Sequence, residues 1–370
     1  MEIFDHIEMH DHEQVVFCSN QESGLKAIIA IHDTKLGPAL GGTRMWNYTS
    51  TEAALKDVLR LSRAMTYKSA VAGLNFGGGK AVIIGDSAIM KNELLFRTFG
   101  KFIDGLSGRF ITAEDVGTTV KDMEYVRMET KYVTGISKSL GGSGEPAPVT
   151  SYSVYVGMKA CAHQKWGSDS LRGRKIAIQG AGQVARFLCE HLYSEGAELF
   201  ITDLLDEKIK RVLETVKAHV VKPDEIYDIN CDIFSPNALG GIINDETIPR
   251  IKAEIIAGGA NNQLEDEEKH GQMIFEKGIL YAPDYVINAG GLINVANEIE
   301  GYRQDRAMKQ AEGIYEIVKR IFLKSIEHNI PTNVASQKIA EERLEKIGSI
   351  RQIYSGTSQY SGRLGELIKK

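Results

Sequence analysis

Three charged side chains in the first half of the chain are of the types that proton chemistry needs. The first, Lys80, follows Gly77-Gly78-Gly79 and precedes the apolar run Ala81-Val82-Ile83-Ile84. An ammonium group beside a buried strand is costly to desolvate unless an anion lies opposite it, and burial of a lysine favours the neutral amine that can accept a proton. Successive glycines also expose the backbone, so we expect this stretch to let a ligand approach main-chain N–H groups closely.

The other two charged residues lie on either side of this stretch. Lys68 precedes it, near the end of a predicted helix, and Asp115 comes later, directly after a predicted strand. Each residue also has an ordinary alternative role. Lys80 could be a surface lysine after a turn, Lys68 could complement a helix dipole, and Asp115 could cap a helix. We expect the rest of the chain to bring a cofactor to these three residues.

The elements that must position them begin with a hairpin, predicted over residues 15–32 from two apolar runs around a turn. Thr49 and Glu52 have the spacing of a capping box, and the apolar residues that follow recur at helical spacing. A helix is therefore expected to start at Thr49 and to end near Lys68. Next come a predicted helix, a predicted strand and a Gly-, Ser- and Pro-rich domain boundary, over residues 91–106, 109–112 and 139–148.

The second segment contains a nucleotide-binding pattern in its full structural context. An apolar strand, 175–179, leads into Gly180-Ala181-Gly182-Gln183-Val184-Ala185, and a helix and a second strand follow up to Asp203. The glycines permit the tight turn and the approach of a pyrophosphate, and the helix N-terminus favours its negative charge. Asp203 is placed to bind the adenosine ribose and would repel a 2′-phosphate, so we expect NAD rather than NADP.

Alternating helices and strands continue after this unit. A helix is predicted over residues 207–219, a long helix joining the domains over 304–326, and a further helix over 339–347. Three more strands end in small or amide residues, and ligands of parallel sheets lie beyond the carboxyl ends of the strands. These residues are candidates for the cofactor side, with ordinary turn chemistry as the alternative: Ser235, Asn261, Asn262 and Asn288.

Composition excludes several classes of protein. The 370 residues favour two domains, and a net charge of −5 argues against a nucleic-acid partner. No apolar run is long enough to span a membrane, and the acidic N-terminus does not resemble a signal peptide. The four cysteines form no C-x-x-C pair, which is typical of reduced thiols in a cytoplasmic protein. His6, His10 and His12 lie among acidic residues and indicate a solvated face, so we expect no metal.

Several motifs together resemble the family of glutamate, leucine, phenylalanine and valine dehydrogenases. They are Lys68, the Gly77–Lys80 stretch, Thr112–Gly117 and the nucleotide-binding unit. Within this family, three stretches are most similar to the leucine dehydrogenases: Leu36–Trp46, Val133–Gly135 and Tyr281–Asn294. The likeness covers nearly the whole chain.

The resemblance implies a role for each candidate residue. Lys68 would hold the α-carboxylate of the substrate, Lys80 would polarise the keto oxygen and activate water, and Asp115 would accept and return protons. A neutral amine and a carboxylate together supply the acid–base steps that oxidative deamination needs. The residues implied in NAD binding are Gly180, Ala181, Gly182, Gln183, Val184, Ala185 and Asp203, with Thr150, Asn261 and Asn262 near the nicotinamide.

The resemblance implies that the loop containing Leu40 helps to determine which substrate binds. Gly41 and Gly42, which follow it, are also expected to bind the substrate. Glutamate dehydrogenases with a similar loop carry lysine where this chain has Leu40, so a second carboxylate would be buried without a counter-charge. Similarity implies an aliphatic pocket, and Leu292 stands where leucine dehydrogenases commonly carry valine. One methylene is worth only about 1–3 kcal/mol, so leucine, isoleucine and valine should overlap as substrates. The expected pocket residues are Leu40, Ala113, Leu292 and Val295.

The sequence therefore predicts a two-domain α/β enzyme of branched-chain amino acid catabolism, with its active site in the cleft between domains. Residues 1–148 with 327–370 are expected to form the substrate-binding and oligomerisation domain, and 149–326 the Rossmann NAD-binding domain. The expected reaction converts L-leucine and similar amino acids to 2-keto acids and ammonia. The alternatives are a valine or phenylalanine dehydrogenase and, remotely, a non-catalytic NAD-binding regulatory protein. The resemblance also implies a homo-oligomer, with an octamer as in leucine dehydrogenases.

Overall fold

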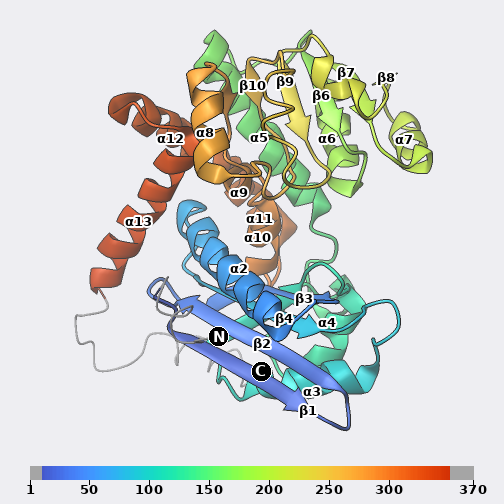
Figure 1. Ribbon diagram of the computed structural model, residues 1–370, viewed down its shortest axis with the longest axis vertical. Coiled ribbons are helices and arrows are strands. Elements are labelled where there is room, and N and C mark those ends of the chain that lie inside the picture. Colours follow the sequence, from blue (N-terminus) through green and yellow to red (C-terminus); the bar gives the residue numbers. More distant parts are fainter. Residues whose placement is uncertain (1–10, 351–370) are drawn as a thin grey trace.

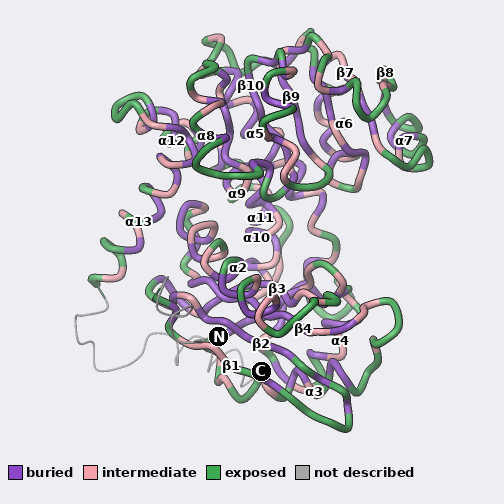
Figure 2. The backbone as a smooth tube through the Cα atoms, in the orientation of Figure 1, coloured by how far each residue is buried: buried purple, intermediate pink, exposed green. Residues whose placement is uncertain are grey.

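The computed structural model describes residues 11–350 and shows two lobes, each built around its own β-sheet (Figure 1). Figure 2 shows that the buried backbone follows the two sheets and the helices packed on them, whereas exposed residues concentrate in the outer loops. The predicted two-domain α/β fold is confirmed. The two lobes meet around one helix, α2 (Thr51–Val71), which lies on the first sheet and faces the second lobe.

The first sheet has the strand order β1-β2-β4-β3-β5 within the described residues. The antiparallel pair β1 and β2 confirms the predicted hairpin, and β3 is parallel to both β4 and β5. The strands are β1 (Gln14–Asn20), β2 (Leu25–Asp33), β3 (Ala39–Trp46), β4 (Gly77–Ile84) and β5 (Phe110–Glu114), and the other helices of this lobe are α3 (Glu93–Asp104) and α4 (Val120–Arg127).

Helix α2 starts one residue later than the capping pattern predicts. Its N-cap is Ser50, whose hydroxyl accepts a hydrogen bond from the backbone N–H of Ala53 at 3.0 Å. The proposed cap at Thr49 is wrong, because two adjacent residues carry hydroxyls and only the second has the required spacing to the first free N–H groups. The helix also runs to Val71, so Lys68 lies in its last turn.

The glycine run of β4 serves close packing. A β-carbon on Gly78 would lie 2.1 Å from the backbone nitrogen of Thr66 in α2, and one on Gly79 would lie 2.7 Å from the ring of Phe110. Strand β4 also lies between β2 and β3, so its main-chain groups pair with neighbouring strands. The expectation that these glycines expose N–H groups to a ligand is therefore wrong.

The second sheet is parallel and has the order β11-β10-β9-β6-β7-β8 in the described chain. This order is that of a doubly wound Rossmann sheet, in which β6 stands at the point where the strand order reverses. The strands are β6 (Lys175–Gln179), β7 (Glu198–Thr202), β8 (His219–Val220), β9 (Ile233–Pro236), β10 (Ile255–Ile256) and β11 (Leu280–Tyr281).

Two predicted helices of this lobe have different limits. The helix predicted over 207–219 ends at Leu213, because His219 and Val220 join the sheet as its edge strand. The long helix predicted over 304–326 is divided at Gly313 into two helices. The helices here are α5 (Ala147–Trp166), α6 (Gln183–Glu195), α7 (Asp206–Leu213), α8 (Glu267–Glu276), α9 (Asp284–Ile287), α10 (Gly290–Ala296), α11 (Gln304–Glu312), α12 (Ile314–His328) and α13 (Thr332–Ile350), with short 3₁₀ turns at Lys138–Leu140 and Glu225–Asp228.

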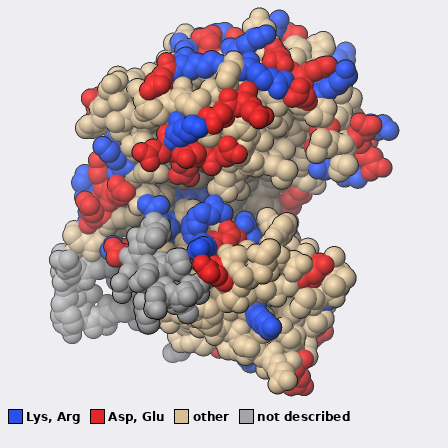
Figure 3. Space-filling view, in the orientation of Figure 1, with Lys and Arg blue, Asp and Glu red and all other residues tan. Residues whose placement is uncertain are grey.

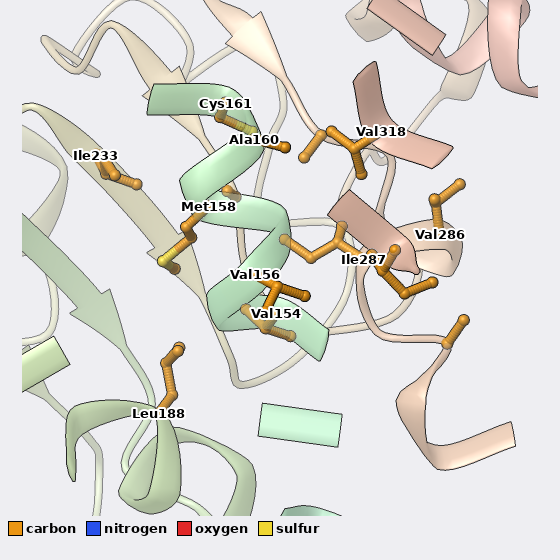
Figure 4. Close-up of a cluster of buried hydrophobic side chains, with 14 of the residues drawn as sticks. Val154, Val156, Met158, Ala160, Cys161, Leu188, Ile233, Val286, Ile287 and Val318 are labelled. Atoms are coloured by element: carbon orange, nitrogen blue, oxygen red, sulfur yellow. The ribbon is translucent and has the colours of Figure 1, made fainter. Parts of the chain in front are cut away.

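Helix α5 forms the centre of the largest apolar core. It has buried side chains around its circumference because it lies between the sheet and the helices α9 to α12 (Figure 4). A helix that is apolar all round is typical of such a buried position. The core residues labelled in Figure 4 include Val154, Val156, Met158, Ala160 and Cys161 of α5 with Leu188, Ile233, Val286, Ile287 and Val318.

Helix α13 crosses from the second lobe to the end of α2 (Figure 1). There the guanidinium group of Arg343 donates hydrogen bonds to the carbonyl oxygens of Leu74 at 2.7 Å and Gly73 at 3.2 Å, and to Asn75 Oδ1 at 2.8 Å. A cation at a helix C-terminus complements the helix dipole. The two lobes are thus joined through α13 as well as through the chain before α5.

The remaining sequence expectations concern histidines, cysteines and membranes. His12 is buried, with Nε2 at 3.0 Å from Ser62 Oγ, so it does not lie on a solvated face, and His6 and His10 lie outside the described residues. The four cysteines are buried as free thiols, and burial raises the pKa of each. Between residues 11 and 350, no helix is long and apolar enough to cross a membrane, and no acidic, His or Cys cluster could hold a metal.

Candidate active site

Lys80 and Asp115 form an ion pair on the first sheet. The Lys80 side chain is only 6% exposed, and its Nζ lies 3.1 Å from Asp115 Oδ1. Lys80 stands within β4, and Asp115 directly follows β5, with β3 between these two strands. A β-carbon on Gly42 of β3 would lie 2.9 Å from the Asp115 β-carbon. The missing side chain at Gly42 therefore lets the carboxylate reach across β3 to the lysine.

Asp115 is not a helix cap. The N-cap of α4 is Thr119, which forms a capping box with Asp122. The carboxylate of Asp115 instead has a second cation, because Arg44 Nε donates to its Oδ2 at 3.0 Å. Burial opposes the ionisation of Asp115, but Lys80 and Arg44 outweigh burial and hold the pKa of its carboxyl below the ordinary value. Asp115 is thus held as a carboxylate with one cation at each oxygen.

Lys68 approaches this pair from α2. Its Nζ donates a hydrogen bond of 2.5 Å to Asn288 Oδ1, across the boundary between the two lobes. Burial lowers the pKa of Lys68 to about 8, and the neighbouring charge of Lys80 acts in the same direction, whereas Asp284 and Asp115 oppose the shift. Figure 3 shows Lys and Arg gathered with acidic residues in the recess between the lobes. The three charged residues singled out in the sequence therefore come together in the structure.

Asn288 connects this group to the second sheet. Its Nδ2 donates to Asn261 Oδ1 at 2.7 Å, in the loop that follows β10. Asn262 is the next residue in that loop and has a left-handed backbone, with φ of 52°. Its carbonyl oxygen accepts a hydrogen bond from Gly241 N at 2.7 Å. Asn288 stands at the C-terminal end of the short helix α9, so its predicted place at a strand end is wrong, but its side chain and that of Asn261 lie in one hydrogen-bonded group with Lys68.

The turn after β6 can hold a dinucleotide. Gly180 has a φ of 96°, which favours glycine, and the N-terminus of α6 at Gly182 has no side-chain cap. A β-carbon on Gly182 would meet nothing within 4 Å, so a phosphate has room to approach the free N–H groups. Asp203 follows β7, and its Oδ2 accepts a hydrogen bond from Ala181 N at 2.8 Å. These residues fit the phosphates and ribose of NAD.

Thr150 lies in the first turn of α5, next to Gly291 of α10. Its Oγ1 donates a hydrogen bond to Pro146 O at 2.9 Å. A β-carbon on Gly291 would lie 2.9 Å from Thr150 Oγ1. Gly291 therefore leaves space beside the Thr150 hydroxyl. The role of Thr150 at the nicotinamide end of the cofactor stays a prediction.

The residues expected to line the side-chain pocket come from both lobes, and their common role stays a prediction. Leu40 on β3 and Leu292 on α10 are buried in the same apolar cluster, and the partly exposed Val295 packs against it. Ala113 is buried on β5, paired with Gly42. A β-carbon on Gly41 would lie 1.8 Å from Gly79 O, so this glycine permits close contact between β3 and β4.

Two contacts of the site were not predicted. Arg44 stands two residues after Gly42 on β3, so both residues face the same side of the sheet as Asp115. This alternation was available in the sequence and could have marked Arg44 as a partner for the carboxylate. The hydrogen bond between Lys68 and Asn288 joins residues far apart in the chain, and no local pattern indicates it.

A Rossmann domain that faces a buried lysine–aspartate pair and a second lysine defines a dehydrogenase for substrates that carry a carboxylate. Two family models match the chain. The first, Glu/Leu/Phe/Val dehydrogenase, dimerisation domain, matches residues 12–132, and the second, Glutamate/Leucine/Phenylalanine/Valine dehydrogenase, matches residues 201–346. The chain belongs to the Glu/Leu/Phe/Val dehydrogenase family, and it is an amino-acid dehydrogenase.

Individual relatives are similar over nearly their whole length. A leucine dehydrogenase of Geobacillus stearothermophilus is 60% identical over 95% of each chain. One from Bacillus subtilis is 56% identical over 98% of this chain and all of the relative. The crystal structure of L-tryptophan dehydrogenase from Nostoc punctiforme superposes with a TM-score of 0.82 and 49% identity, over 93% of this chain and 99% of that chain.

Proposed function

We propose that the protein catalyses the NAD-dependent, reversible oxidative deamination of L-leucine and other branched-chain L-amino acids to 2-keto acids and ammonia. The observation that carries the proposal is the Lys80–Asp115 pair at 3.1 Å, with Lys68 beside it and the dinucleotide turn opposite. The leucine dehydrogenases that are 56–60% identical support the choice of substrate.

In this mechanism, each charged group has one task. The ammonium group of Lys68 binds the α-carboxylate, with Asn288 as its neighbour on the other lobe. The Gly180–Ala185 turn and Asp203 would hold NAD, which would supply the acceptor for the hydride that leaves the substrate Cα as the amine becomes an iminium. Once the Lys80 ammonium group has passed its proton to Asp115, the resulting amine takes a proton from the water that attacks the imine carbon, and the re-formed ammonium group then polarises the developing keto oxygen. Asp115, within hydrogen-bonding distance of Lys80, accepts protons and returns them to the departing ammonia.

The aliphatic side chains expected in the pocket, Leu40, Leu292 and Val295, support an aliphatic side chain as the preferred substrate group. Leu40 is fully buried and offers no counter-charge to a second carboxylate, which disfavours glutamate. Valine and phenylalanine remain the alternative substrates within the same family. A phenylalanine dehydrogenase of Thermoactinomyces intermedius is 45% identical, which is less than the leucine enzymes.

We also propose a division of labour between the two lobes. Residues 1–148 with 327–370 would bind substrate and form the subunit contacts of a cytoplasmic homo-oligomer, with eight subunits as the specific expectation. Residues 149–326 would bind NAD. The family model named for dimerisation matches residues 12–132, which supports subunit contacts in the first lobe.

The proposal is tested by measuring NADH formation with leucine, isoleucine, valine, phenylalanine and glutamate. Strong turnover of the three aliphatic substrates and little of glutamate is expected. Lys80→Ala should bind NAD normally and lose turnover, whereas Lys26→Ala, which removes an exposed lysine from the neighbouring strand β2, should keep both. Turnover of glutamate above leucine, or near-normal turnover by Lys80→Ala, would refute the proposal.

A further inference from the structure

We propose that Arg44 is a positioning residue for the reaction, which orients the Asp115 carboxylate toward Lys80, and that Asp57 and Tyr48 hold Arg44 in place. The inference rests on the proposed proton-transfer role of Asp115. Arg44 binds the oxygen of Asp115 that does not face Lys80, so we assign its effect on the reaction to Asp115.

The geometry gives each oxygen of Asp115 its own cation. Oδ1 lies 3.1 Å from Lys80 Nζ, and Oδ2 accepts the Nε–H of Arg44 at 3.0 Å. Rotation of the carboxylate about its Cβ–Cγ bond would break both contacts at once. The guanidinium group is planar and its donors have a fixed geometry, so an arginine anchored at its other end sets the plane of the carboxylate.

That other end is anchored on α2. Arg44 Nη1 donates to Asp57 Oδ2 at 3.0 Å, and the same oxygen accepts the hydroxyl hydrogen of Tyr48 at 2.6 Å. Asp57 Oδ1 is occupied by Arg60 at 3.0 Å. Burial opposes ionisation of Asp57, but Tyr48, Arg44 and Arg60 lower the pKa of its carboxyl below the ordinary value. Burial and the hydrogen bond to Asp57 raise the pKa of Tyr48, so Tyr48 remains a neutral donor.

The result is a row of alternating charges, Lys80, Asp115, Arg44 and Asp57, that runs from the site to the flank of α2. The side chains of Arg44 and Asp57 are 21% and 17% exposed, so solvent screens these contacts less than it screens surface pairs. Asp115 has a cation on each side in this row, which favours its ionised form against the effect of burial.

Loss of Arg44 should therefore affect catalysis in a defined way. The groups that face Asp115 are Lys80 from β4, Arg44 from β3, Lys68 from α2 and its own neighbour Glu114. Without Arg44, one of the two directly bonded cations is lost while burial and Glu114 remain. The carboxyl would then protonate at higher pH, and the carboxylate, no longer held at Oδ2, could rotate so that Oδ1 leaves Lys80. Both changes lower turnover without removing a contact to the substrate.

A purely structural role for Arg44 makes a different prediction, because Arg44 also ties β3 to α2. The two roles are separated by steady-state kinetics across pH, with thermal unfolding and NAD binding measured on the same samples. The variants are Arg44→Met, Arg44→Lys and Asp57→Asn. The matched control is Arg97→Met, which removes an arginine that also bridges two carboxylates, Glu93 and Glu129, in the same lobe.

For Arg44→Met we expect kcat for leucine to fall about tenfold or more, with KM changed less than about threefold. The acidic limb of the kcat profile should move up by about one pH unit. Asp57→Asn should show the same changes at smaller size. Arg44→Lys should keep the acidic limb and lose part of kcat, because it retains the charge and loses the planar fork, and it carries the test if Arg44→Met fails to fold. Arg97→Met should leave kcat and the acidic limb unchanged.

A folded Arg44→Met variant with kcat within about twofold of wild type and an unmoved acidic limb would overturn the positioning role. A fall in kcat that Arg97→Met reproduces would also overturn it, because the effect would then be one of general stability. In either case the proposed function stands as long as the wild-type protein turns over branched-chain substrates. A wild-type protein that is inactive on all of them would refute both proposals together.

Discussion

The substitution Gly78→Ala distinguishes packing from ligand binding as the reason for the glycine run in β4. An alanine β-carbon at this position would lie 2.1 Å from both the backbone nitrogen and the Oγ1 of Thr66, and 2.6 Å from the carbonyl oxygen of Ser62. Ordinary van der Waals contact begins at 3.4 Å. Helix α2 would therefore have to recede from the sheet by about 1.3 Å to accept a single methyl group.

The expected cost follows from what the methyl group meets. Overpacking of a core commonly costs about 1–3 kcal/mol, and backbone atoms of a long helix cannot rotate away as a side chain does. We therefore expect a loss near the upper end, about 3 kcal/mol. At roughly 2–4 °C for each kcal/mol, this loss lowers the thermal midpoint by about 6–12 °C. Turnover should fall as well, because α2 carries Lys68 and β4 carries Lys80.

The assay is thermal unfolding of Gly78→Ala beside Gly182→Ala, with NAD affinity measured for both. Gly182 has a φ of −69°, and a β-carbon there would meet nothing within 4 Å, so alanine should fit without strain. Gly182→Ala should keep or slightly raise the thermal midpoint, because alanine restricts the unfolded chain. It should weaken NAD binding, because the methyl group occupies the space left for the phosphates.

We thus expect opposite effects of the two substitutions on the thermal midpoint. A Gly78→Ala protein that melts within about 1 °C of wild type while losing substrate or cofactor affinity would refute the packing argument. Such a result would restore the interpretation in which the glycine run faces a ligand.

Two further predictions concern substrate recognition. Leu40→Lys should lower kcat/KM for leucine by about 100-fold or more, because it places an unpaired ammonium group at a fully buried position. It should also raise the activity on glutamate relative to leucine. Unchanged relative rates would show that Leu40 does not determine substrate choice. Lys68 loses its charge above its pKa of about 8, so the affinity of the protein with NADH for 4-methylpentanoate should fall roughly tenfold per pH unit above that pH. Lys68→Arg should flatten this slope, because arginine keeps its charge. Calorimetric titration from pH 7 to 10 measures both affinities.

The same pKa also affects folding stability, with a defined sign. Lys68 binds its proton less tightly in the folded protein than in the unfolded chain, because burial lowers its pKa. The cost of burying the ammonium group is therefore fully present below pH 8 and is relieved as the pH rises from about 8 toward the ordinary value.

The nucleotide-binding unit was predictable because its chemistry is local. Strand, Gly180–Ala185 turn, helix and Asp203 follow one another in the chain, and each part has a backbone or charge requirement that few residues meet. The grouping of Lys68, Lys80 and Asp115 was predicted from residue type and from resemblance. The structure shows why they meet: Gly42 has no side chain, and α2 packs closely on β4.

The parts that escaped prediction depend on distant neighbours. A glycine run looks the same in the sequence whether a ligand or a helix packs against it. For β4, the position of Thr66 in the structure shows that a helix does. Arg44 meets Asp115 after β5 and Asp57 on α2, so its two partners follow from the order of the strands and from the packing of α2 on the sheet. The division of the long C-terminal helix at Gly313 leaves the apolar periodicity on both sides undisturbed, so the pattern predicted one helix.

The contact of α13 with the end of α2 has a consequence for how the recess between the lobes can widen. Arg343 fixes α13 to Gly73 and Leu74, and on a separate segment the carboxylate of Glu298 accepts hydrogen bonds from the backbone of Gly135 at 3.0 Å. The hydrogen bond from Lys68 to Asn288 is a third contact across the boundary between the lobes. Widening of the recess should therefore require at least one of these three contacts to break.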